Sequence, residues 1–139
     1  MIMKKNFLLL LFPIALISCE EEGNLTRTIA PEINIPVNSV PVNQGLFVPT
    51  SGINVTGGAK IYLENGQYKV VLDNFSISNG PDLKVYLSKT SLPNDFVNLG
   101  NLTSATVFPI PPNIALSEYK YALIHCQQYN HLFAVAQLK

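Results

Sequence analysis

The stretch KIYLENGQYKVVL, Lys60 to Leu72, decides the fold class of this chain. Two runs rich in isoleucine, tyrosine, leucine and valine flank the dipeptide Asn65-Gly66. Asparagine and glycine both tolerate the positive φ that the tight turn of a two-residue β-hairpin requires. The stretch therefore predicts two antiparallel strands that are joined at Asn65-Gly66.

Short β-type runs continue after this hairpin. The turn residues Asn79-Gly80-Pro81-Asp82 precede LKVYLS, residues 83–88, in which apolar residues occupy alternate positions. YKYALIHC, residues 119–126, and HLFAVAQL, residues 131–138, are the last two predicted strands. Strands that recur about every 8–12 residues, with turn signals between them, predict an all-β chain with a single antiparallel β-sandwich or barrel-like domain.

Two later segments carry too many turn-forming residues to be predicted as central strands. LPNDFVNLGNL, residues 92–102, is predicted to be a loop. VFPIPPN, residues 107–113, is too rich in proline for the middle of a sheet, because proline cannot donate to the ladder.

The first residues have the three-part layout of a secretory signal. Lys4 and Lys5 precede the apolar run 7–17, which is shorter than the roughly 17–25 residues that cross a bilayer. Leu16-Ile17-Ser18-Cys19 resembles the lipobox of bacterial lipoproteins, and the resemblance implies cleavage before Cys19 and lipidation of its sulfur. Glu20-Glu21-Glu22 resembles the acidic patch that follows this cysteine in some surface-exported lipoproteins of the Bacteroidetes.

The chain is thus predicted to have three parts: a signal peptide over 1–18, a proline-spaced linker over 19–43 and a β domain over 44–139. Prolines recur in the linker and favour extended chain. The linker residues nearest the domain are expected to pack on it as an edge strand. The predicted location is the cell envelope, anchored by lipid to the outer membrane, with the domain periplasmic or surface-exposed.

Charge and motifs exclude several classes of function. After residue 18 the chain carries 7 basic and 9 acidic side chains, a balance of 7 − 9 = −2. No cluster of lysine or arginine remains to bind phosphates, so we expect no nucleic-acid partner. The sequence has no triad spacing, phosphate-binding glycine loop or HExxH motif, so we do not expect an enzyme. The expected partners are the membrane and an unidentified redox protein or surface ligand.

Three blocks of the sequence resemble the DM13 domain family, over about residues 45–138. The most specific block contains Gly80, Pro81, Asp82, Leu83 and Tyr86 in the order Gly-Pro-Asp-Leu-x-Val-Tyr-Leu. The others are the step Leu-Gly-Asn-Leu at 99–102 and the late strand that holds the cysteine. The resemblance implies a β-rich fold and an electron-transfer role.

The family's single cysteine corresponds to Cys126, and the resemblance implies that it acts as a bare thiol or through a prosthetic group. Two departures from the family pattern lie near this site. His125 stands where the family often has tryptophan, and SATVFPIP, residues 104–111, replaces a glycine- and tyrosine-containing stretch, with Phe108 at the aromatic position.

The residues alone leave the role of Cys126 open. Lipid on Cys19 would leave Cys126 as the only thiol, which excludes an intramolecular disulfide. Strand alternation places Cys126 on one face with Ala122 and Ile124, as is typical of a small packing residue. Cys126 is therefore either a redox thiol or a buried structural residue of a surface binding or adhesion module.

His125 and His131 are weaker candidates for metal ligands. Adjacent strand residues such as His125 and Cys126 point to opposite faces. Cys126 and His131 together would give two ligands, and a zinc site needs three or four. We expect no metal site, with a haem or metal cofactor as the minor alternative.

Overall fold

The computed structural model describes residues 39–139, which form eight strands and one short 3-10 helix. The predicted signal peptide, Cys19 and most of the predicted linker lie outside these residues. No helix within residues 39–139 is long and apolar enough to cross a membrane. The elements are β1 Asn43–Pro49, β2 Val55–Glu64, β3 Gln67–Ile77, β4 Leu83–Ser88, β5 Phe96–Asn101, β6 Val107–Pro109, η1 Leu116–Glu118, β7 Tyr121–Cys126 and β8 His131–Gln137.

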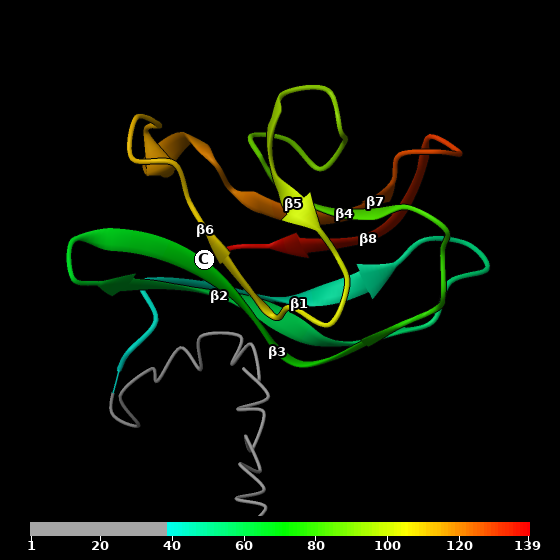
Figure 1. Cartoon of the computed structure of the whole chain (residues 1–139), viewed down its shortest axis with the longest axis horizontal. Helices are drawn as coiled ribbons and strands as arrows, with labels where there is room; N and C mark the ends of the chain where they lie inside the picture. The colour runs from blue at the N-terminus through cyan, green and yellow to red at the C-terminus, as the bar shows by residue number, and fades with distance from the viewer. Residues whose placement is uncertain (1–38) are drawn as a thin grey trace, which may run out of the picture. The chain divides into compact units, whose positions relative to one another are not determined.

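The strands form one antiparallel sheet, in the order β5-β4-β7-β8-β1-β2-β3-β6, that curls into a nearly closed barrel (Figure 1). Strand β1 connects the two halves of the sheet, because its first residues pair with β2 and its last residues pair with β8. The outermost strands approach each other, since the Phe108 ring of β6 lies 3.8 Å from the position of a Cβ at Gly100 of β5. The prediction of an all-β, barrel-like domain is confirmed.

The hairpin predicted at Asn65-Gly66 is present as β2 and β3. Glu64 is opposite Gln67 across the turn, and the φ angles of Asn65 and Gly66 are 50° and 78°. The paired residues continue along both strands, and Lys60 and Asp73 form an ion pair of 2.7 Å across them. The turn chemistry therefore sets the register of the longest hairpin in the described chain.

The inner faces of the strands enclose one hydrophobic core. Each fully buried leucine, isoleucine or valine side chain contributes about 1.5–3 kcal/mol relative to exposure. The alternation predicted for β4 is confirmed, because its apolar positions point inward. Core side chains with no exposed surface include Ile61, Val70, Val85, Leu87, Ile124 and Cys126.

The structure corrects the prediction for residues 92–102, because Phe96–Asn101 form strand β5 and not a loop. Strand β5 pairs with β4, and the Phe96 ring stacks on Tyr86 at a centroid distance of 4.0 Å and an angle of 11°. Cross-strand pairing thus outweighs the local turn propensities of this segment. Strand β6, in the proline-rich segment, lies at the sheet edge as expected.

The residues just before β1 extend the ladder only through their backbone. The Val42 amide donates a hydrogen bond to the Ile61 carbonyl at 2.8 Å. The Val40 side chain is 83% exposed and the Val42 side chain 48% exposed. Of the linker residues expected to pack on the domain as an edge strand, Val42 joins the ladder through its backbone, whereas the side chains of Val40 and Val42 are exposed.

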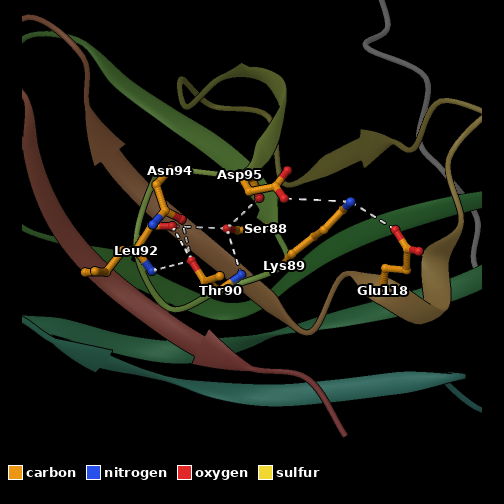
Figure 2. Close-up of polar contacts among 7 residues, drawn as sticks. All are labelled: Ser88, Lys89, Thr90, Leu92, Asn94, Asp95 and Glu118. Atoms are coloured by element: carbon orange, nitrogen blue, oxygen red, sulfur yellow. Dashed lines mark hydrogen bonds and ion pairs between the residues drawn. The ribbon is translucent and has the colours of Figure 1, made fainter.

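A polar network fixes the connection between β4 and β5 (Figure 2). The Ser88 side chain is fully buried, and its Oγ lies 3.2 Å from the Leu92 carbonyl oxygen and 3.1 Å from that of Asp95. Lys89 Nζ forms ion pairs with Asp95 at 3.7 Å and with Glu118 of η1 at 3.0 Å. These contacts give the buried Ser88 hydroxyl its hydrogen-bond partners and order the C-terminal end of β4.

Candidate functional site

Cys126 is the last residue of β7 and lies inside the core. It is opposite Leu83 of β4 on one side and His131 of β8 on the other. Its exposed fraction is 0%, and it belongs to the same buried cluster as Ala122 and Ile124, as strand alternation predicts. The side chain is therefore sealed from solvent in this structure.

The two most specific sequence blocks meet at this position. Leu83 belongs to the block that begins at Gly80 and faces Cys126 across the ladder. The amide of Gln127, the residue after Cys126, donates a hydrogen bond to the Asp82 carbonyl at 3.0 Å. The fold thus places the turn before β4 against the end of β7, although the two are far apart in the sequence.

Gly80 allows this turn to pack closely on the core. A Cβ at Gly80 would lie 2.7 Å from Leu83 Cδ2 and 3.1 Å from Phe133 Cζ. The Leu83 and Phe133 side chains therefore meet beside Gly80, in space that any larger residue would need. Both side chains are buried, at 8% and 7% exposure.

The other motif residues beside the turn have structural contacts. The Asp82 carboxylate forms an ion pair of 2.7 Å with Lys84, whose side chain is 13% exposed. Tyr86 is 2% exposed, and burial raises the pKa of its phenol. Pro81 is exposed in the turn.

His125 lies on the opposite face of β7 from Cys126 and is also buried, at 5% exposure. Its ring centroid is 5.4 Å from that of Tyr86, and the Tyr86 ring stacks on Phe96. The three rings form an aromatic cluster. Burial lowers the pKa of His125. A hydrogen bond with Asn130 raises this pKa, and the nearby His131 lowers it further. Its Nδ1 is buried with no hydrogen-bond partner among the described residues.

Sequence reasoning missed this aromatic cluster. It places Phe96 in a loop, so nothing in the sequence indicates a residue that covers the outer face of β4. The alternation in β7 distinguishes two faces, but it does not show that both are buried.

A β-bulge lies next to Cys126 in the β7–β8 hairpin. Ile124 is opposite Ala134 and His125 is opposite Leu132, so Phe133 has no partner in β7. Thr50, just after β1, makes three hydrogen-bond contacts with this bulge. Its Oγ1 lies 2.6 Å from the Leu132 carbonyl oxygen and 3.1 Å from that of Phe133, and its amide donates to the Phe133 carbonyl at 2.9 Å.

The candidate metal ligands do not converge. Within residues 39–139 there is no group of three or more histidine, cysteine, aspartate or glutamate side chains that could hold a metal ion. Cys126 is in the core, His125 is on the other face of β7, and His131 is exposed with its ring 5.2 Å from that of Phe133. Sequence reasoning correctly separates His125 from Cys126.

The packing around Cys126 does not fit a bound prosthetic group. Cys126 has no exposed surface, and three cavities of the described domain, of about 410, 450 and 260 Å³, are not lined by it. Leu83 lies directly opposite Cys126 in β4, and Phe133 belongs to the same buried cluster. A bare thiol is the chemistry that these residues can offer.

A protein-family model described as "Electron transfer DM13" matches residues 50–138. The match begins directly after β1, includes the Gly80–Leu83 turn and Cys126, and covers more than half of the chain. No curated protein and no solved structure matches the chain.

Proposed function

The chain belongs to the DM13 family, and we propose that its β domain is a non-enzymatic redox module in which the Cys126 thiol transfers electrons. The observation that carries this proposal is the match to an electron-transfer family over residues 50–138. Cys126 is the only free cysteine among the described residues, so the domain itself offers no internal dithiol.

Thiol–disulfide exchange is the simplest reaction for a single thiol. The Cys126 thiol loses its proton to solvent, and the thiolate attacks a disulfide of a partner protein. A mixed disulfide between Cys126 and the first partner forms, and the other thiolate of that partner leaves. The thiolate of a second partner then attacks the first partner's sulfur in the mixed disulfide, which releases Cys126 as a thiolate and leaves a disulfide that joins the two partners.

This reaction requires access that the closed structure does not offer. The attacking thiolate must meet the target sulfur, and the exposed fraction of Cys126 is 0%. The proposed module therefore works through a minor conformation in which Cys126 is open to a partner.

We place this module at the cell envelope as part of the same proposal. The basic start, the short apolar run and the Leu16–Cys19 motif support lipidation of Cys19. Two or more acyl chains would anchor the protein stably in the outer membrane. An extended linker of about 3.1 Å per residue would hold the domain several tens of Å from the lipid.

The test combines an absorbance spectrum with disulfide exchange on the native, lipid-free domain. Without a prosthetic group, the spectrum should show protein absorption alone. Glutathione disulfide should form a mixed disulfide with native Cys126, detected by intact mass, and a dithiol should reverse it. The Cys126→Ala variant is the control. Exchange that occurs only after full unfolding would contradict the redox proposal.

The complete burial of Cys126 favours a second candidate, a surface binding or adhesion module with a structural cysteine. This candidate predicts a native thiol that does not exchange. It also predicts that Cys126→Ala reduces stability and leaves ligand binding unchanged. The exchange experiment therefore separates the two functions.

A further inference from the structure

We propose that residues 127–133, the turn and the start of β8, form a lid over Cys126, and that Thr50 is the latch that keeps this lid closed. The inference goes beyond the proposed function, because it concerns access to the thiol and holds whether or not the thiol is redox active.

The ladder around Cys126 marks where such a lid would separate. Beyond the bulge at Phe133, the hairpin has two paired positions, His125 with Leu132 and Cys126 with His131. On its other side, Cys126 stays paired with Leu83 of β4. The lid can move away from β7 while Cys126 remains in the sheet, once these two pairs and the hydrogen bond from the Gln127 amide to the Asp82 carbonyl break. A local opening of this kind costs less free energy than global unfolding.

Phe133 is the part of the lid that enters the core. Its ring is buried and meets Leu83, the partner of Cys126 in β4, beside Gly80. When the lid moves outward, the Phe133 ring leaves the part of the core at the end of β7, where Cys126 lies. The turn that precedes it is exposed from Gln127 to Asn130, so the rest of the lid has little buried surface to lose.

Thr50 ties the lid to a different part of the barrel. Its hydroxyl lies 2.6 Å from the Leu132 carbonyl oxygen and 3.1 Å from that of Phe133, and its amide donates to the Phe133 carbonyl at 2.9 Å. All three contacts span more than 80 residues of sequence and reach the bulge from the segment that follows β1. Phe133 cannot leave the core with the lid unless these contacts break.

The test is the rate at which native Cys126 reacts with the neutral probe dithiodipyridine at one pH. Thr50→Val keeps the shape of the side chain and removes the hydroxyl donor. We expect the rate to rise about fivefold, which corresponds to the loss of a net hydrogen bond of about 1 kcal/mol. Thr50→Ser retains a hydroxyl and should restore a rate close to that of the wild type.

The matched control is Ser78→Ala. Ser78 Oγ accepts a hydrogen bond from the Asn54 amide at 2.9 Å, and neither residue belongs to the lid. Its removal should leave the Cys126 rate unchanged, and global stability is measured for each variant by denaturant unfolding. Equal rates in Thr50→Val and wild type would overturn the latch, as would an equal rise in Ser78→Ala.

The reaction of the wild type tests the lid itself. Cys126 should react faster than global unfolding allows, because only the lid must open. A rate equal to the global unfolding limit would overturn the lid. If the lid opens but Cys126 does not react with glutathione disulfide, the redox function is refuted and the lid proposal still holds.

Discussion

Leu83 and Cys126 face each other directly on β4 and β7. This pairing joins the turn at Gly80 to the end of the cysteine strand, and the side chains of Leu83 and Cys126 are buried in the same core. The two most characteristic parts of the sequence thus form one structural unit around the thiol.

The first prediction concerns packing at Cys126. Cys126→Ala removes a fully buried sulfur and leaves a small cavity, so the free energy of unfolding should fall by about 1 kcal/mol. Denaturant unfolding measures this loss. The exposed residue Gln127 next to it provides the control, since Gln127→Ala should change stability by less than about 0.5 kcal/mol. Equal stability of Cys126→Ala and wild type would show that the sulfur contributes no packing.

The second prediction concerns the close approach at Gly80. Gly80→Ala places a methyl group 2.7 Å from Leu83 Cδ2, and relief of this contact should cost about 1–3 kcal/mol. Leu83→Ala removes the atom that the methyl group meets. The double variant should therefore be more stable than the sum of the two single losses predicts. Simple additivity in the unfolding free energies would contradict this explanation.

The third prediction is a pH dependence due to His125. Burial lowers its pKa in the folded protein below the ordinary value of 6.5, so the unfolded chain binds more protons in mildly acidic solution. The free energy of unfolding is therefore highest above pH 6.5, where the ring is neutral in both states. It falls as the pH drops through that value. Unfolding free energies at pH 7.5 and pH 5.5 should show this fall.

The neighbours of His125 define the controls for this pH dependence. Lys84, paired with Asp82, is opposite His125 in β4, Tyr86 is beside its ring, and His131 is close on β8. His125→Phe should reduce the fall in stability, whereas His131→Gln should retain most of it. An unchanged fall in His125→Phe would assign the effect to another group.

The fourth prediction concerns the stack of Phe96 on Tyr86. Phe96→Ala removes an aromatic pair and exposes the Tyr86 ring, so stability should fall by about 1–2 kcal/mol. Leu92 lies in the adjacent connection and is 57% exposed, so Leu92→Ala should change stability by less than about 0.5 kcal/mol. Similar losses in the two variants would show that the stack contributes little.

Local chemistry explains which parts of the fold sequence analysis predicts. The Asn65-Gly66 turn and the apolar face shared by alternate residues of β4 and β7 are local signals, and each appears in the structure. Strand β5 has local turn residues and becomes a strand because it pairs with β4, which no local pattern indicates.

The surroundings of Cys126 were predictable only in part. Alternation indicates that its side chain points inward with Ile124. The hydrogen bonds from Thr50 to the bulge and the contact of Gly80 with Phe133 join distant segments, so no spacing in the sequence reveals them. The bulge itself shifts the register without a glycine or proline to mark it.

The position of β1 has a mechanical consequence. Gln44, near its start, exchanges backbone hydrogen bonds with Lys139 on one side and is paired with Lys60 of β2 on the other. A pulling force directed along the axis of β1 therefore acts in shear on two ladders at once. Such a strand resists extraction better than one that can be peeled from an edge, a single rung at a time.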